Sequence, residues 1–166
     1  SPQLTTYDGS VFQPSWSPDG SSIVFAARPA GEEGTDIYLL DLATNDVVQL
    51  TNITYGVARF PRWSPDGQTV AYLSDYAIEV DLIDGYEVEG YEVHLLRPST
   101  SESVRLTRVE DIQGIFGPPV WSPDGKYLLV VSLTEAAVYI VDVETGRIAE
   151  LVDTYLAVSD WFILDS

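Results

Sequence analysis

Short apolar runs alternate with clusters of Gly, Pro, Asn and Asp along the chain, and this pattern predicts β-strands. Three such runs are followed, each after a loop, by a second run that ends in a polar residue. The first runs are Ile23–Phe25, Val70–Leu73 and Leu128–Val131, and the second runs are Ile37–Asp41, Val93–Arg97 and Val138–Asp142. Both sets are rich in β-branched and aromatic residues, and no stretch keeps a helical period for three turns. The pattern therefore predicts an all-β chain.

The pentapeptide Trp-Ser-Pro-Asp-Gly occurs three times, at Trp16–Gly20, Trp63–Gly67 and Trp121–Gly125. Proline presets the backbone for the second position of a type I turn, aspartate suits the third position, and glycine tolerates the positive φ that follows. Each copy also has a proline two residues before the tryptophan and a Leu-Thr pair 12 to 15 residues upstream. We interpret each unit as strand A into the tryptophan, a tight turn, strands B and C, and strand D at Leu-Thr. Four antiparallel strands repeated at this period are typical of a β-propeller blade.

Several repeat residues are expected to be structural. We predict that the tryptophans pack between neighbouring blades and that the aspartates and glycines fix the turns. The tryptophans are Trp16, Trp63, Trp121 and Trp161, and the turn residues are Asp19, Gly20, Asp66, Gly67, Asp124 and Gly125.

The repeat boundaries predict three complete blades and part of a fourth. We expect blade 1 at about 11–52, blade 2 at about 58–108 with a β-arm inserted at 75–90, and blade 3 at about 118–153. A split blade would combine residues 1–6 and 156–166, the last and first strands of a fourth unit. Propellers typically close with four to eight blades. Three alternatives follow: a piece of a longer propeller, copies that complete one another in a closed pair or an open polymer, or a compact four-bladed monomer.

These units resemble the TolB-type, WD-like propeller repeat, whose mark is Pro-x-Trp-Ser-Pro-Asp-Gly with an upstream Leu-Thr. The resemblance covers nearly the whole chain. It implies a mostly extracytoplasmic propeller that serves as a binding platform, or a regulatory or gating domain attached to a peptidase. Fold resemblance alone does not transfer function.

The charge of the chain narrows the set of partners. Its net charge is −18, from 26 acidic and 8 basic residues, and Lys126 is the one lysine. Nucleic acid is excluded as a partner because phosphate binding needs a positive field. No apolar run approaches the length of a membrane span, so membrane insertion is not expected. The sequence has no cysteine and therefore neither a disulfide nor a thiolate metal site.

Propeller geometry places the A–B and C–D turns on one face and the B–C and D–A loops on the other. The turns of the first face are short and repetitive, whereas the loops of the second are long and differ from blade to blade. Function tends to lie on irregular loops held by a regular scaffold. We therefore predict a binding surface on the long-loop face, with the candidate residues Tyr55, Arg59, Asp81, Asp84, Tyr86, Glu87, Glu89 and Phe116.

The 75–90 insertion is the most individual part of the chain. Asp84-Gly85 is a strong signal for a two-residue hairpin turn, so we predict a protruding β-arm that docks on a neighbour or is simply solvated. If calcium bound here, its ligands would be Asp75, Glu79, Asp81 and Asp84. Their spacing does not match the Asp-x-Asp-x-Asp-Gly loop, and alternation along a strand spreads carboxylates over two faces. We expect no cofactor.

Catalysis within these residues is not expected. His94 is the one histidine, so a Ser-His-Asp triad would have to use it. The repeats align His94 with Tyr38 and Tyr139, which indicates a packing position. We predict a non-enzymatic, extracytoplasmic propeller that binds proteins, either other copies of itself or the remaining blades of a longer propeller. The alternative is the propeller portion of a larger hydrolase, such as a prolyl-oligopeptidase-like peptidase, with its catalytic domain outside this chain.

Overall fold

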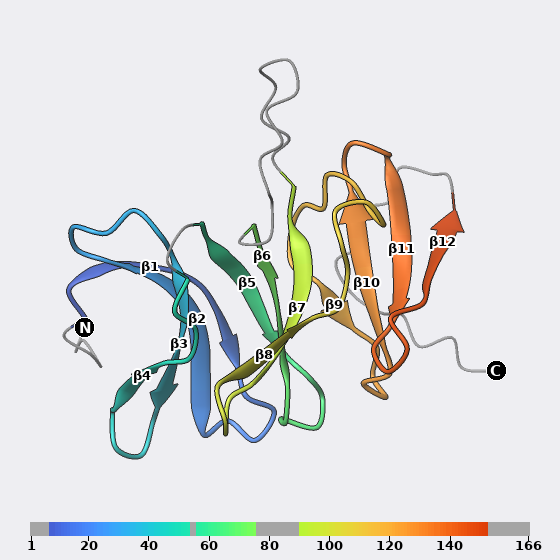
Figure 1. The fold of residues 1–166 in the computed structure, drawn as a ribbon. Coiled ribbons are helices and arrows are strands. Elements are labelled where there is room, and N and C mark those ends of the chain that lie inside the picture. The colour runs from blue at the N-terminus through green and yellow to red at the C-terminus, as the bar shows by residue number, and fades with distance from the viewer. Residues whose placement is uncertain (1–6, 54–55, 76–89, 153–166) are drawn as a thin grey trace.

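The structure is a computed structural model that describes residues 7–53, 56–75 and 90–152. These residues form three four-stranded antiparallel sheets that stand side by side (Figure 1). The first is β1 (Gly9–Trp16), β2 (Ser22–Pro29), β3 (Asp36–Asp41) and β4 (Val47–Gln49). The second is β5 (Ala58–Trp63), β6 (Val70–Ser74), β7 (Glu92–Arg97) and β8 (Glu102–Arg105), and the third is β9 (Val120–Trp121), β10 (Tyr127–Ser132), β11 (Ala137–Asp142) and β12 (Ile148–Val152).

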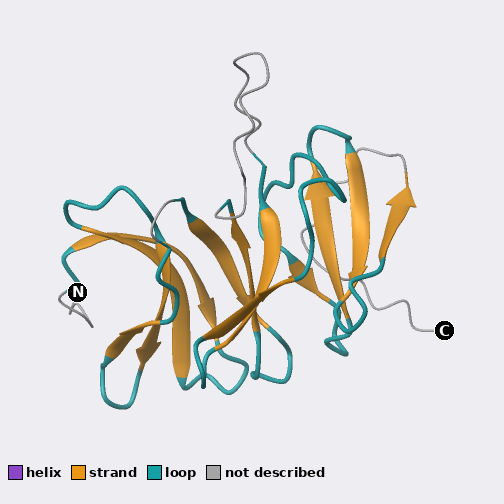
Figure 2. Ribbon diagram, viewed as in Figure 1, coloured by secondary structure: helices purple, strands orange, loops and turns teal. Residues whose placement is uncertain are grey.

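Each sheet has its strands in chain order, and Figure 2 shows only strands and loops over the described residues. This is the all-β architecture that the sequence predicts. We refer to the three sheets as blades 1, 2 and 3. The predicted β-arm turn at Asp84-Gly85 and the predicted split blade, which includes Trp161, lie outside the described residues.

The core has two layers between neighbouring blades and a third apolar cluster, with Phe25 and Tyr38, on the face of blade 1 that points away from blade 2. Successive residues of a strand point to opposite faces of its sheet, so one strand can serve both layers. From β6, Val70 and Tyr72 pack with blade 1, while Ala71 and Leu73 pack with blade 3. Because both faces of blade 2 are covered, all five residues of β6 are buried. This burial of both faces explains why the strand is apolar at nearly every position.

The Trp-Ser-Pro-Asp-Gly turn is held by a hydrogen-bond network that recurs in all three blades. In blade 2, Gly67 N donates to Ser64 O at 3.0 Å, and Gly67 has a φ of 68°. Ser64 Oγ donates to Asp66 Oδ1 and accepts from Thr69 N at 3.0 Å. The serines of the other two turns make the same pair of hydrogen bonds. The turn therefore depends on serine as much as on the aspartate that the sequence singles out.

Replacing Ser64 by alanine should lower the free energy of unfolding by about 1–3 kcal/mol, because Thr69 N would lose its side-chain acceptor in a buried setting. Urea denaturation measures the change, and Gln68→Ala in the same turn is the control. The Gln68 side chain is exposed and only its backbone N donates within the turn. An equal effect of the two substitutions would contradict this role of the serine.

The sequence predicts that the Leu-Thr pairs form the outer strand, but the two described pairs, Leu50-Thr51 and Leu106-Thr107, follow that strand directly. Strand β4 ends at Gln49, and Thr51 Oγ1 then accepts a hydrogen bond from Ile37 N at 2.9 Å. In blade 2, Thr107 Oγ1 accepts from Val93 N at the same distance. The hydroxyl takes the place of a backbone carbonyl at the point where the outer strand leaves the sheet.

A buried acidic residue directly precedes Ile37 in blade 1 and Val93 in blade 2, the two residues whose backbone N–H groups bond to the threonines. Asp36 is 5% exposed and accepts hydrogen bonds from Gln49, Thr51 and Ile53 N. Glu92 is 2% exposed, accepts from Val109 N and lies 3.4 Å from Arg105 Nη1. Buried carboxylates are tolerated when they are paired in this way. These acids anchor the outer strands and the loops that follow them.

The tryptophans differ in their surroundings. Trp63 and Trp121 are half-buried and pack in the layers between blades. Trp16 is 62% exposed, which corrects the expectation that it packs between two blades. The physical reason is its position on the face of blade 1 that points away from blade 2, where no described blade covers it.

Candidate functional site

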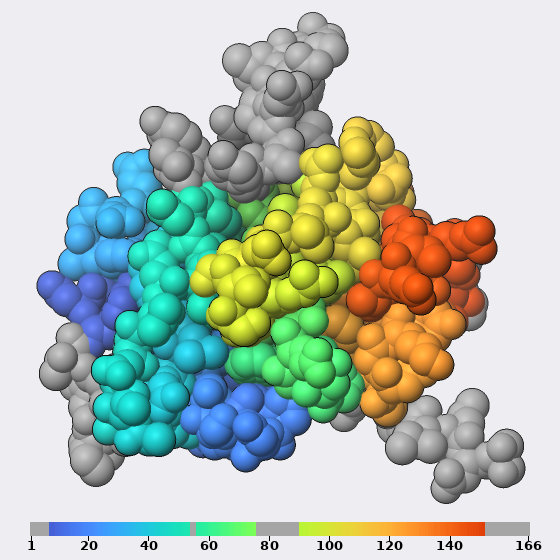
Figure 3. All heavy atoms as spheres, turned by 60° about the horizontal axis from the view of Figure 1, so that its bottom comes forward, coloured from blue at the N-terminus to red at the C-terminus, as the bar shows by residue number. Residues whose placement is uncertain are grey.

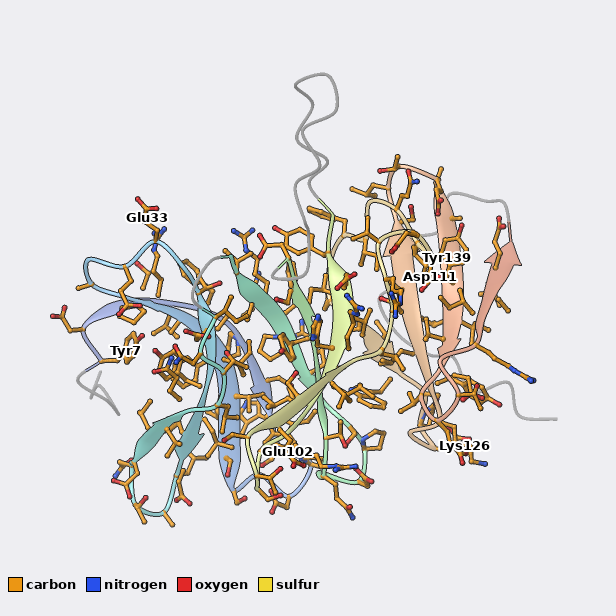
Figure 4. The ribbon with its side chains drawn as sticks, viewed as in Figure 1. Tyr7, Glu33, Glu102, Asp111, Lys126 and Tyr139 are labelled. Atoms are coloured by element: carbon orange, nitrogen blue, oxygen red, sulfur yellow. The ribbon has the colours of Figure 1, made fainter. Side chains whose placement is uncertain are left out.

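The long loops and the short turns lie on opposite faces of the molecule. Figure 4 shows Glu33, in the loop between β2 and β3, at one edge, and Lys126, in the turn before β10, and Glu102, at the start of β8, at the other. Figure 3 looks toward the turn edge, where the three blades pack directly against one another. The long-loop face is therefore the irregular side of the scaffold.

Three exposed side chains lie at equivalent places in the blades, two of them on the inner strands β1 and β5 and the third in the segment that leads into β9. These are Phe12, Arg59 and Phe116, which we call the inner row. The register makes them equivalent: Phe12 pairs with Ala26 of β2, Arg59 pairs with Leu73 of β6, and Phe116 N donates to Val131 O of β10.

An irregular backbone conformation next to each member of the inner row sets the direction of its side chain. The residue after each member has a positive φ, namely 53° at Gln13, 54° at Phe60 and 83° at Gly117. A β-bulge of this kind bends the strand and redirects a side chain. The register shifts of β1 and β5 fall at this place. Non-glycine residues rarely adopt a positive φ, so Gln13 and Phe60 are held there by their surroundings.

Hydrogen bonds tie the inner strands of successive blades together. Phe60 N donates to Gln13 Oε1 at 2.9 Å, from blade 2 to blade 1. Trp121 Nε1 donates to Arg62 O at 3.0 Å, from blade 3 to blade 2. The strands that carry Phe12 and Arg59, and the strand that follows Phe116, are therefore linked to one another by hydrogen bonds.

The inner row combines a cation with aromatic surface. Phe12 is 40% exposed, Phe116 is 58% exposed and Arg59 is exposed. The Arg59 guanidinium lies 5.9 Å from the centre of the Tyr91 ring, a cation–π contact that orients it. Leu133 is 60% exposed and directly follows β10, the strand whose Val131 O accepts the hydrogen bond from Phe116 N. Aromatic residues and arginine are the types enriched in protein interfaces.

The structure brings two of the predicted site residues, Arg59 and Phe116, to equivalent places. The other candidates, Tyr55, Asp81, Asp84, Tyr86, Glu87 and Glu89, lie outside the described residues, as does Glu79. Sequence reasoning missed Phe12. Its signal was its position two residues before Pro14, which matches that of Arg59 before Pro61. In blade 3 an extra residue between Phe116 and Pro119 hides the correspondence.

A groove of about 580 Å³ opens between blades 1 and 2 at their outer strands. It is lined by Gln49, Leu50, Thr51, Asn52, Ile53, Tyr72, Ser101 and Ser103. The Tyr72 and Ser103 hydroxyls are hydrogen-bonded to each other at 2.8 Å. Its lining has no carboxylate and no basic group, in contrast to the acidity of the whole chain.

His94 occupies a packing position and not an open site. Its side chain is 13% exposed, and its ring lies 5.3 Å from that of Tyr72. Burial lowers the pKa of His94 to about 4, and the charge of Arg105 acts in the same direction. A histidine of this pKa is neutral at pH 7, and its ring is largely buried.

Asp75 is the one proposed calcium ligand that the structure describes, and its Oδ1 accepts a hydrogen bond from Val57 N. Across residues 7–53, 56–75 and 90–152, no three His, Cys, Asp or Glu side chains converge as a metal site would require. The same residues include no helix that is long and apolar enough to cross a membrane.

No protein-family model matches the sequence. The chain is 32% identical over 133 residues to the uncharacterized peptidase YuxL of Bacillus subtilis, covering 76% of this chain and 18% of that protein. It is 34% identical over 104 residues to the Tol-Pal system protein TolB of Francisella tularensis subsp. mediasiatica, covering 63% of this chain and 21% of that protein. The crystal structure of TolB from Acinetobacter baumannii superposes with a TM-score of 0.67 at 26% identity, covering 90% of this chain and 34% of that one.

The three sheets and these likenesses define an all-β protein of the β-propeller class, of which the described residues form a part. The relatives named TolB and the solved TolB propellers support a TolB-type β-propeller repeat for this chain. It spans about a fifth of the length of the curated relatives that it matches.

Proposed function

We propose that the chain is a protein-binding module and that the inner row is the centre of its binding surface. The observation that supports this is the equivalent placement of Phe12, Arg59 and Phe116 in adjacent blades, each exposed and each followed by a residue of positive φ. Exposed aromatic surface around an oriented arginine serves no purpose in the core of the fold. In an interface, such residues supply most of the binding energy.

The chemistry of the inner row points to an apolar protein segment that carries a carboxylate. Phe12 and Phe116 offer apolar area, and Arg59 offers a planar donor that can bind a carboxylate through two hydrogen bonds. Because the chain carries a net charge of −18, a partner that is acidic throughout would be repelled. An isolated carboxylate at Arg59 is compatible with that charge, whereas an extended acidic surface is not.

We further propose an extracytoplasmic location and association with other copies or with further blades, both supported by the TolB-type repeat. The alternative from another class is the propeller portion of a larger hydrolase. The likeness to a protein named as a peptidase supports it. That alternative requires that the gene continue past the codon for Ser166 into a domain with a catalytic nucleophile, which sequencing of the locus decides.

Peptides selected from a display library on the immobilised chain test the binding surface. We expect Arg59→Glu or Phe116→Ala to weaken the Kd of the selected peptides at least about tenfold, as loss of an interface hot spot does. Lys126→Glu is the matched control, because it makes the same change of charge at an exposed residue of the turn face.

Fluorescence anisotropy with labelled peptides gives the Kd for each variant. Equal weakening by Arg59→Glu and Lys126→Glu would show that overall charge, and not the inner row, controls binding. Peptides that bind all variants alike would place the binding surface elsewhere.

A further inference from the structure

Strand β5 carries a second arginine on the side of the sheet that bears Arg59. Arg59 lies opposite Leu73 of β6, and Arg62 lies opposite Ala71. Residues that face each other across two strands project to the same side of a sheet. Leu73 and Ala71 both pack toward blade 3. The two arginines therefore share one side of β5, despite the register shift between them.

Arg62 is half-buried and has little to bind within the molecule. Its Nη1 donates to Pro61 O at 2.9 Å. Burial lowers the pKa of the Arg62 guanidinium, because the cation loses solvation. Over the part of the chain that the structure describes, neither Arg59 nor Arg62 forms an ion pair with a carboxylate. A guanidinium has five N–H donors, so most of those of Arg62 remain available to a ligand.

The arginine at this position is specific to blade 2. Register gives the equivalent residues as Ser15, opposite Val24 in blade 1, and Val120, opposite Leu129 in blade 3. The repeat therefore forms without a charge here. A charge that is partly removed from water is costly unless it is paired. A cation of this kind that the fold does not require points to an anionic ligand.

The spacing of the two arginines defines the form of that ligand. Their partners on β6 are two residues apart, so their backbones are separated by about 7 Å along the strand. Side chains at positions i and i+2 of an extended peptide have the same spacing and project to the same side. Because β5 runs from the loop after β4 to the Trp-Ser-Pro-Asp-Gly turn, Arg59 is nearer the long-loop face and Arg62 lies deeper.

We infer that Arg62 binds a second carboxylate of the partner segment, two residues along the segment from the carboxylate at Arg59. This inference rests on the proposed function and specifies its partner as an extended segment with Asp or Glu at positions i and i+2. Each guanidinium can bind one carboxylate through two hydrogen bonds. Apolar residues of the same segment would contact Phe12 and Phe116.

The peptides selected from the display library are the probes. We expect the pool to be enriched in Asp or Glu at two positions separated by one residue. Each acidic residue is then changed to its amide, and fluorescence anisotropy gives the Kd with the wild-type chain, Arg59→Gln and Arg62→Gln. We expect either amide to weaken wild-type binding at least about tenfold, as loss of a charged hydrogen-bond partner does.

A double-mutant cycle assigns each carboxylate to one arginine. In Arg62→Gln, the amide at one peptide position should cause no further loss, while the amide at the other position should still weaken binding at least about tenfold. Arg59→Gln should show the reverse. A general disturbance of the fold would weaken binding of all peptides alike and would not produce this pairing.

Two further variants separate geometry and total charge. Arg62→Lys keeps the charge but cannot form the paired hydrogen bonds, so it should restore only part of the affinity. Arg147→Gln is the matched control, because it removes one arginine charge at an exposed residue of the turn between β11 and β12. Its Kd values should equal those of the wild-type chain.

Failure of this inference is distinct from failure of the proposed function. A pool with a single acidic position, or Kd values that Arg62→Gln leaves unchanged while Arg59→Gln weakens them, would overturn the second carboxylate site alone. Equal weakening by Arg62→Gln and Arg147→Gln would overturn it too. If neither Arg59→Gln nor Arg62→Gln changes the Kd, or if no peptide is selected, the binding surface itself is overturned.

Discussion

Replacing Trp63 by alanine is expected to lower the free energy of unfolding by about 3–5 kcal/mol, the usual cost of removing a large aromatic side chain from a core. The same substitution at Trp16 should cost less than about 1 kcal/mol, because little of a side chain that is 62% exposed is removed from packing. The two residues occupy the same position of the same pentapeptide. Any difference between the two losses of stability is therefore caused by contact with the neighbouring blade and not by the local sequence.

Urea denaturation of both variants, followed by far-ultraviolet circular dichroism, gives the comparison through the shift of the transition midpoint. Fluorescence is less suitable because each substitution removes one of the four tryptophans. A large loss of stability at Trp16, equal to that at Trp63, would mean that Trp16 is covered in solution. In that case the variant should be measured again at low protein concentration, where a contact between copies dissociates.

Acid should destabilise the fold through His94 between pH 6.5 and 4. Burial, with the charge of Arg105, lowers the pKa of His94 to about 4, from an ordinary value of 6.5. The unfolded chain therefore binds a proton as pH falls below about 6.5, and the folded chain does so only near 4. Stability is full above pH 6.5 and declines between pH 6.5 and 4. We expect a loss of roughly 2–3 kcal/mol across this window.

The groups that face His94 explain why its pKa falls despite a neighbouring acid. Glu92 Oε2 lies 3.8 Å from His94 Nε2, but Glu92 also lies 3.4 Å from Arg105 Nη1 and accepts from Val109 N. Its charge is thus already compensated. Tyr72 covers the ring from a second side. Burial remains the dominant effect and disfavours the imidazolium.

His94→Phe should remove the stability loss between pH 6.5 and 4, which urea denaturation at several pH values measures. His94→Tyr is a second variant, since blades 1 and 3 carry Tyr38 and Tyr139 at the same position. A slope that persists in both variants would contradict the role of His94.

The turn aspartates define a separate, more acidic window. Hydrogen bonds from Ser17 and Ser21 lower the pKa of Asp19 to about 2, and equivalent bonds lower those of Asp66 and Asp124. Their contribution is present above the ordinary carboxyl pKa and is lost only as pH falls below it, so it does not overlap with that of His94.

Local patterns were sufficient for most of the fold. Short β-branched runs bounded by Gly and Pro predicted strands B and C of each blade, and the Trp-Ser-Pro-Asp-Gly string predicted strand A and the turn after it. The outer strand was misplaced at Leu-Thr, because a threonine hydroxyl there replaces a backbone acceptor, as at Thr51 and Ile37. Nothing in the local pattern distinguishes a side-chain acceptor from a strand carbonyl.

The candidate site was less accessible from the sequence. Arg59 and Phe116 were predicted because the sequence places them in long D–A loops, although Arg59 in fact lies in β5, whereas Phe12 falls within the predicted first strand and was not selected. Only the register and the positive φ of the next residue make the three equivalent. The side-chain network of Ser64 in the turn was likewise invisible, since its partner Thr69 N lies across the hairpin.

The sequence by itself determined the fold class, the repeat and the turns, because each follows from side-chain period and backbone preferences within a few residues. The tertiary structure alone decided which identical residues differ in role. Trp16 and Trp63 have the same local sequence, yet one is exposed and the other packs between blades. Burial depends on which sheet lies against a face, and that contact joins residues far apart in the chain.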